Sequence, residues 1–398
     1  MSRTPQKIRN TATLVIIILF VITLQFTAGC SDVGHKPLTF DIWVLKIDAD
    51  GNEQWTATID GDPNGSGTEM IQTLDGGYAI VGRGTGPERT TGTQSTADGG
   101  SVIVGGGTYA LIRIVTLDAK GEAGLDIKTN TSPDSGRSLV EAPGGGYAVT
   151  TRLGYLKHID ESGTVLWSTK LGEESDPWAW RGIKAPDGGY ATAGNNRSIR
   201  LDEDGTILWE TAFAPDRSAR TIIAAPTGGF VTGGTCDSGV WVTMLDAEGD
   251  GVWDRTFSTE LPARLYIIRL SPDGTYDLIY GTKQHVSEHY QEHRWITETT
   301  EVTLSADGEQ LGEKPVQVSQ VIVATEDGGY AYCGYSNPQH NDLRSSHYPG
   351  SPLRVVRLDN AGEIVWDASF DIGDHRPVTS IIQTADGGFA LFGEHLDF

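Results

Sequence analysis

Residues 187–209 read DGGYATAGNNRSIRLDEDGTILW, and this segment indicates the fold of the whole chain. It carries two turn signals between apolar runs, an Asp-Gly-Gly turn before Tyr190 and an Asp-x-x-Gly turn before Trp209. Asp-Gly and Gly-Gly between alternating apolar residues predict a tight hairpin, because such turns need positive φ angles. Asp-x-x-Gly predicts a second hairpin, closed by a type I turn with Gly in the left-handed conformation. Together with its flanks, the stretch predicts four strands.

Both signals recur seven times along the chain. The aromatic residues that follow the first signal are Tyr78, Tyr147, Tyr190, Phe230, Tyr276, Tyr330 and Phe389, spaced 40 to 69 residues apart. The glycines of the second signal are Gly51, Gly121, Gly163, Gly205, Gly249, Gly308 and Gly362. A four-stranded unit that repeats at this spacing is typical of propeller blades. We therefore predict an all-β fold, a seven-bladed β-propeller with four antiparallel strands per blade.

The order of the signals predicts how the ring closes. The strand before Gly-Gly is expected to be innermost (strand 1), and the Trp-bearing strand outermost (strand 4). The chain starts with strands 3 and 4, at about 41–47 and 52–59, and ends with strands 1 and 2, at about 378–384 and 389–395. The last blade is thus expected to be closed by both termini, which removes open edges. The recurring Trp is interpreted as packing between blades.

Long insertions are expected on one face only. Up-and-down strand order places the tight 1–2 and 3–4 turns on one face and the 2–3 and 4–1 loops on the other. The insertions at 83–108, 282–294 and 335–352 all fall in 2–3 loops. Because loops vary without disturbing a repeat core, we expect function on this decorated face.

These motifs resemble known families. The Asp-x-x-Gly-x-x-x-Trp half is similar to PQQ-type quinoprotein repeats, and the Gly-Gly-Tyr half resembles a kelch repeat. Together they look like the PQQ-like and kelch-like repeat lipoproteins of bacterial and archaeal surfaces. The resemblance covers residues 40–398 and implies a propeller fold, with little information on activity.

The first residues predict export and membrane anchoring. A basic segment containing Arg3, Lys7 and Arg9 precedes an apolar run, and Thr-Ala-Gly then leads into Cys30. This order is a secretory signal, and the Cys after Ala-Gly resembles a lipobox. We expect a signal peptide at 1–29, a lipidated Cys30 with a tether at 30–39, and the propeller at 40–398. An uncleaved membrane span and ordinary secretion are the alternatives; all three place the domain outside the cytoplasm.

Charge and cysteine content limit the possible partners. The net charge is −23 and the pI is about 4.7, which argues against nucleic acid, a ligand that requires clustered Lys and Arg. Only three Cys are present, so the chain is no disulfide scaffold. No motif for a cofactor is evident, and none is expected.

Arginines recur near the start of the predicted innermost strands. The candidate anion-binding residues are Arg137, Arg181, Arg220 and Arg264, with Arg376 close to the equivalent place. Such a ring would suit a carboxylate or phosphate ligand. The alternative is that each Arg pairs with an acidic residue of its own loop, for which Asp134, Asp176, Asp216 and Asp374 are available.

Two further groups are weaker candidates. His285, His289 and His293 are four residues apart, so that a helix would place them on one face as a metal site. A polar loop without metal is the alternative. Trp178 and Trp180 are candidates for aromatic contact with a sugar, and packing is the alternative.

We interpret the chain as a membrane-anchored extracytoplasmic lipoprotein that binds or scaffolds. Its loop-rich face is expected to hold a protein or glycan ligand. The alternative is a propeller enzyme of the quinoprotein or polysaccharide-lyase type, for which no catalytic residue stands out. Convergent charged groups with perturbed pKa values would favour the enzyme.

Overall fold

The structure is a computed structural model. It describes residues 39–63, 65–86, 93–95, 101–103, 110–129, 134–172, 180–287, 293–319, 321–336, 343–344, 351–373 and 377–397. Thr39–Phe398 forms one compact unit. All regular secondary structure in the described residues is strand. Among these residues, no helix has the length and apolar character needed to cross a bilayer.

Seven four-stranded sheets form the blades, numbered 1 to 7 here. Blade 1 contains β3 (Ser66–Gln72), β4 (Tyr78–Thr85), β7 (Ala110–Leu117) and β8 (Ala123–Lys128). Blade 2 contains β9 (Gly136–Glu141), β10 (Tyr147–Thr151), β11 (Tyr155–Ile159) and β12 (Val165–Lys170). Blade 3 contains β13 (Arg181–Lys184), β14 (Tyr190–Gly194), β15 (Arg197–Leu201) and β16 (Ile207–Ala212).

The remaining blades follow the same order along the chain. Blade 4 contains β17 (Ser218–Ala224), β18 (Phe230–Cys236), β19 (Gly239–Leu245) and β20 (Gly251–Ser258). Blade 5 contains β21 (Ala263–Leu270), β22 (Tyr276–Ser287), β23 (His293–Leu304) and β24 (Gln310–Val316). Blade 6 contains β25 (Val321–Ala324), β26 (Tyr330–Ser336), β28 (Leu353–Leu358) and β29 (Ile364–Phe370), with β27 (Leu343–Arg344) beside β26. Blade 7 contains β30 (Val378–Gln383), β31 (Phe389–Asp397), β1 (Thr39–Ile47) and β2 (Glu53–Pro63).

Contacts between the first strands of the blades close the ring. Each of these strands touches the next, in the order β3, β9, β13, β17, β21, β25, β30 and back to β3. The strand before Gly-Gly is therefore the innermost in every blade, as predicted.

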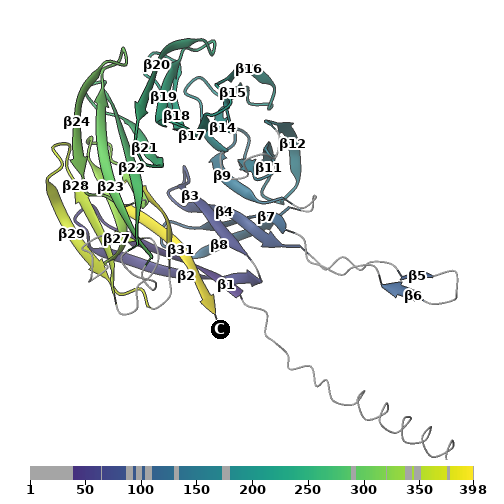
Figure 1. Cartoon of the computed structure of the whole chain (residues 1–398). Helices are drawn as coiled ribbons and strands as arrows, with labels where there is room; N and C mark the ends of the chain where they lie inside the picture. The colour runs from purple at the N-terminus through teal and green to yellow at the C-terminus, as the bar shows by residue number, and fades with distance from the viewer. Residues whose placement is uncertain are drawn as a thin grey trace, which may run out of the picture. The chain divides into compact units, whose positions relative to one another are not determined.

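Blade 7 joins the two ends of the domain. β1 pairs with β31 without a break, from Thr39 opposite Asp397 to Ile47 opposite Phe389. Figure 1 shows the purple β1 and β2 beside the yellow β31. The predicted closure of the last blade by both termini is confirmed, and so is the seven-bladed all-β fold.

The Asp-x-x-Gly turns are held by their own aspartate. In blade 1, Asp118 Oδ1 accepts hydrogen bonds from the backbone N–H groups of Lys120 and Glu122, both at 2.8 Å. Gly121 has a φ of +83°, where a side chain would cost free energy. The sequence of the turn thus fixes the 3–4 hairpin locally.

The recurring Trp packs between blades, as predicted. Trp167 of blade 2 covers Gly205 in the 3–4 turn of blade 3, and its ring lies 5.8 Å from that of Tyr190. Trp366 of blade 6 covers Gly51 of blade 7 in the same way and donates from Nε1 to Ala49 O at 2.8 Å. In these blades the Trp that follows one Asp-x-x-Gly turn thus packs on the Asp-x-x-Gly turn of the next blade.

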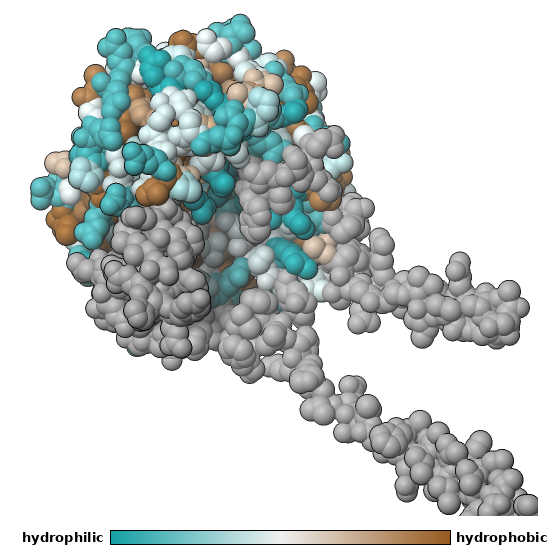
Figure 2. Space-filling model, in the orientation of Figure 1, coloured by the Kyte–Doolittle hydropathy of each residue, from teal (hydrophilic) through white to brown (hydrophobic). Residues whose placement is uncertain are grey.

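The decorated face carries the three predicted insertions. The first contains a small hairpin of β5 (Thr93–Ser95) and β6 (Ser101–Ile103) between β4 and β7. The second is a longer β-hairpin, because β22 and β23 pair as far as Ser287 opposite His293. The third lies between β26 and β28. On the side drawn in Figure 2, the coloured residues are mostly hydrophilic, and hydrophobic ones occur in small separate groups.

A cation on strand 3 holds the 1–2 turn in three blades. Lys46 Nζ contacts Asp386 Oδ2 at 2.9 Å in blade 7. Arg200 contacts Asp187 at 2.7 Å in blade 3, and Arg357 contacts Asp327 at 2.6 Å in blade 6. These ion pairs lie on the face of tight turns and have structural roles.

Candidate functional site

A β-bulge marks the start of the innermost strands. One residue is skipped by the pairing register in β3, β9, β17, β21 and β30. The skipped residues are Thr68, Arg137, Arg220, Tyr266 and Thr379. A bulge re-aims its side chain and is common beside functional sites. Because strand 1 follows the 4–1 loop, these positions lie at the decorated face.

The predicted arginines occupy related but different positions. Arg137 and Arg220 are the bulge residues of blades 2 and 4. Arg181 is the first residue of β13, one position further along its strand, where it pairs with Ala193. Arg264 is exposed and lies two residues before the bulge residue Tyr266. Arg376 lies outside the described residues.

Arg181 forms an ion pair with a residue that lies two blades away. Its Nη1 contacts Glu69 Oε1, which belongs to blade 1, two blades away. The other oxygen, Glu69 Oε2, accepts a hydrogen bond at 3.0 Å from the backbone N–H of Leu139 in blade 2. The side chain of Arg181 is 47% exposed and that of Glu69 is 22% exposed. Three blades therefore meet at one carboxylate.

Burial dominates the electrostatics of Glu69. It raises the pKa of this carboxyl above its ordinary value of 4.5, although Arg181 and the Leu139 N–H oppose the shift. Ionised Glu69 is therefore less stable at this position than it would be in water.

Arg137 adds positive charge beside this pair. Burial, together with the like charges of Arg152 and Arg181, lowers its pKa, while Asp134 acts in the opposite direction. Arg152 is exposed in the tight turn after β10, on the decorated face. We name Glu69, Arg137, Arg152 and Arg181 the axial site. It combines three guanidinium groups with one carboxylate.

Asp134, one of the aspartates proposed as loop partners of the arginines, pairs with a lysine. Asp134 is buried and lies 3.3 Å from Lys157 Nζ, and it also accepts from the N–H of Leu153 at 3.2 Å. Asp62, near the end of β2 in blade 7, likewise lies 2.8 Å from Lys128 Nζ of blade 1. These residues anchor loops of the following blade. Asp216 is exposed, and Asp176 and Asp374 lie outside the described residues.

A second carboxylate lies beside the same inner strand. Glu394 of β31 accepts a hydrogen bond from the backbone N–H of Gly67 at 2.6 Å. Burial raises its pKa, and this hydrogen bond opposes the shift. Tyr266 contributes a buried hydroxyl that has no hydrogen-bond partner among the described residues.

The aromatic and histidine candidates lie away from the axial site or outside the structure. Trp180 is 1% exposed and packs in the core between blades 2 and 3, so its ring is inaccessible to a sugar. Trp178 and His289 lie outside the described residues. His285 is in β22 and His293 in β23, so the expectation of a shared helical face does not apply to them. The structure shows no group of metal-ligating side chains among the residues it describes, and metal binding by this hairpin stays a prediction.

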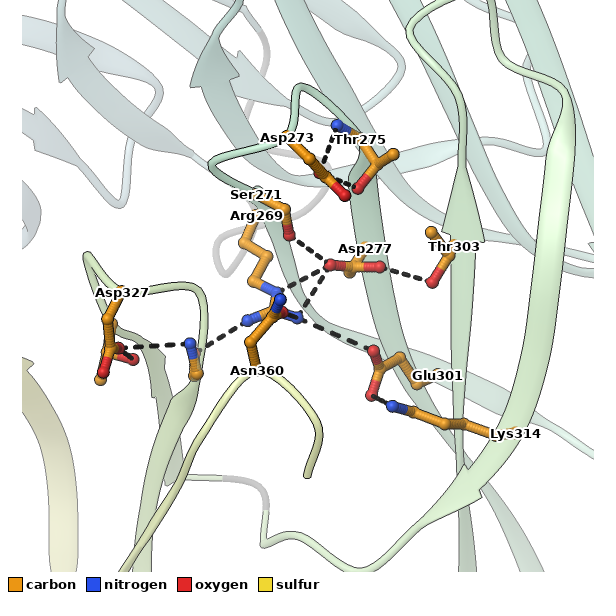
Figure 3. A network of polar contacts seen from close by, with 12 residues as sticks. Arg269, Ser271, Asp273, Thr275, Asp277, Glu301, Thr303, Lys314, Asp327 and Asn360 are labelled. Carbon is orange, nitrogen blue, oxygen red and sulfur yellow. Dashed lines mark hydrogen bonds and ion pairs between the residues drawn. The ribbon is translucent and has the colours of Figure 1, made fainter. Parts of the chain in front are cut away.

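A buried ion network joins blades 5 and 6 near the tight-turn face (Figure 3). Arg269 donates from Nε to Asp277 Oδ2 at 2.9 Å and from Nη1 to Gly329 O at 3.0 Å. Glu301 lies 3.8 Å from Arg269 and 3.5 Å from Lys314. Arg269 and Asp277 are almost fully buried, so this cluster stabilises an interface.

Sequence reasoning missed Glu69 and Arg152. Glu69 occupies in blade 1 the same strand position that Arg181 occupies in blade 3, one residue after the bulge position. Aligning the blades residue by residue would have revealed this opposition of charge. Arg152 gave no repeat signal, because the 2–3 turns vary in length among the blades.

Comparisons with known proteins support the fold. No protein family matches the chain, and no curated protein matches it in sequence. Streptogramin B lyase is similar in structure over 90% of this chain and 98% of its own, at 12% identity and a TM-score of 0.54. The WD40 domain of Neurospora crassa Pan2 is similar over 83% of this chain and 89% of its own, at 9% identity and a TM-score of 0.50. At such identities the likeness concerns the propeller fold alone.

Proposed function

We propose that the protein is an extracytoplasmic binding or scaffold module, tethered to the membrane through a lipid on Cys30. Its axial site holds an anionic group of a protein or glycan partner. The observation that carries this proposal is the carboxylate of Glu69, which Arg181 and the Leu139 N–H hold from two other blades, with the positive charge of Arg137 close to Arg181, in a chain whose net charge is −23. Guanidinium groups in a partly desolvated site are the donors that suit carboxylates and phosphates.

The position of the site supports recognition of a partner. It lies on the decorated face, where the hairpin of β22 and β23 continues past the end of β21. The contacts that stabilise the blades are strand ladders and Trp packing, so the insertions are free to contact a ligand. The relation to PQQ-like and kelch-like surface lipoproteins, suggested by the repeat motifs, agrees with this role.

Anion titrations test the proposal. Glucuronate is titrated into the chain from Thr39 onward by calorimetry, with Arg137→Ala, Arg181→Ala and the double variant in parallel. Arg197→Ala is the matched control, because Arg197 pairs with Glu210 on strands 3 and 4, away from the axis. We expect binding that weakens at least about tenfold in the double variant, equivalent to about 1.4 kcal/mol. Equal affinity in the double variant and the control would contradict the proposal.

An enzyme remains the second candidate function. Glu69 and Glu394 both have raised pKa values, and such groups gather at catalytic sites. Streptogramin B lyase, similar in fold, is an enzyme by name, but the likeness carries no chemistry to this chain. Incubation of the protein with an acidic oligosaccharide, followed by mass spectrometry, separates the two functions. A binder leaves the oligosaccharide intact, whereas a polysaccharide-lyase-type enzyme shortens it.

A further inference from the structure

We infer that the axial site binds carboxylates and that Glu69 occupies it when no ligand is present. A ligand carboxylate binds by replacing Glu69 on Arg181 and on the N–H of Leu139. This inference rests on the proposed function and names the chemical class of the ligand.

Glu69 is held as a bound ligand would be. Its two oxygens have different donors, Arg181 from blade 3 and the Leu139 N–H from blade 2, while its own backbone belongs to blade 1. A guanidinium and a fixed backbone N–H match the planar geometry of a carboxylate. A tetrahedral anion such as sulfate presents its oxygens differently. The Glu69 side chain therefore shows which ligand geometry the site prefers.

Replacement requires that Glu69 leave at low cost. Burial penalises its charged form more than its two donors compensate, as the raised pKa of its carboxyl indicates. Its side chain is also 22% exposed, so solvent reaches it. When a second carboxylate takes both donors, nothing opposes the burial that raises the pKa of Glu69. Glu69 then takes up one proton from the buffer and becomes a neutral acid, so that Arg181 faces the single negative charge of the ligand.

The surrounding charges favour this exchange. Arg137 and Arg152 act on the same region from blade 2, and Asp134 there is already paired with Lys157. From blade 7, Glu394 is held by the N–H of Gly67. On β4 the only charged residue is Arg83, which is exposed opposite Ser66. Arg137 and Arg152 thus add positive charge close to Arg181, which favours a bound anion.

The exchange couples binding to protons. Ligand affinity should fall as pH rises through the folded-state pKa of Glu69, by up to about tenfold per pH unit. Glu69→Gln removes the charged competitor, so its affinity should be higher at neutral pH and nearly independent of pH.

Calorimetry with glucuronate at pH 5 and pH 7.5, in two buffers of different ionisation enthalpy, tests the inference. We expect wild type to take up protons on binding at pH 7.5, and Glu69→Gln to bind at least about fivefold more tightly there without uptake. Glu394→Gln is the control, because the Glu394 carboxyl is also buried with a raised pKa but accepts from the Gly67 N–H, away from Arg181. It should behave as wild type. Glu69→Ala, which also removes the carboxylate, replaces Glu69→Gln if the latter misfolds.

The outcomes separate this inference from the proposed function. Binding by Glu69→Gln but not by wild type supports the inference. Binding that depends on Arg137 and Arg181, with no change in Glu69→Gln and no proton uptake, overturns the inference and leaves the proposed function. Binding of sulfate as tight as that of glucuronate also overturns the inference, because it removes the preference for a planar group. Absence of binding in every variant overturns both.

Discussion

The packing of Trp on the turn glycines predicts that Gly205→Ala lowers thermal stability more than the equivalent substitution Gly362→Ala. Gly205 and Gly362 occupy the same place in Asp-x-x-Gly turns, with φ angles of +79° and +86°. A Cβ at Gly205 would lie 2.6 Å from Cε3 of Trp167. At Gly362 its nearest neighbour would be Lys314 Nζ at 4.0 Å, because blade 5 has Gly312 in place of the Trp.

The expected magnitudes follow from these distances. Either Gly→Ala change costs about 1–2 kcal/mol for the left-handed backbone. Gly205→Ala adds about 1–3 kcal/mol, because Trp167 must move out of a packed interface. For a unit of roughly 360 residues, an unfolding entropy of about 2.1 cal/mol/K per residue gives a shift of about 1.3 °C per kcal/mol. Gly362→Ala should thus melt about 1–3 °C lower than wild type, and Gly205→Ala about 3–6 °C lower.

Thermal unfolding followed by circular dichroism measures both variants. The additional loss in Gly205→Ala should disappear in a Trp167→Leu background, where the ring is absent. Equal melting of Gly205→Ala and Gly362→Ala would refute the role of Trp in joining the blades.

Three further predictions concern closure, charge and anchoring. Deletion of residues 39–63 removes two strands of blade 7, so the remaining chain should aggregate on gel filtration; a monomer with unchanged melting would contradict ring closure. Burial opposes ionisation of Asp386, but the Thr384 hydroxyl and Lys46 outweigh it and hold its pKa below 3.8. Asp386→Asn should therefore be less stable by under about 1 kcal/mol at pH 6, and this deficit should vanish as pH falls through that depressed pKa; a deficit that persists in acid would exclude the ion pair as its cause. Cys30→Ser should move the protein from the membrane to the soluble fraction, and retention in membranes would indicate an uncleaved span.

The sequence predicted the fold because each blade is specified locally. Asp118 and Gly121 determine their turn through contacts within five residues, and the same pattern recurs in the other blades. The His-containing insertion was harder to interpret, because spacing by four suggests a helix while β22 and β23 simply extend their existing ladder. Local spacing does not report a neighbouring strand that continues the pairing.

The candidate site was predicted only in part. Arg137 and Arg181 were found from their repeat positions, but Glu69 was not, because it meets Arg181 at a sequence separation of 112 residues. Only the closed ring brings these side chains together. The pairing of Asp134 with Lys157 was also invisible, since it depends on how a loop packs on the next blade.

A crystal structure of the protein with glucuronate shows whether a ligand carboxylate replaces Glu69 on Arg181. We expect the glucuronate carboxylate about 2.7–3.0 Å from Arg181 and from the Leu139 N–H, with the Glu69 side chain turned away from both. Glucuronate bound elsewhere, with Glu69 still on Arg181, would contradict it.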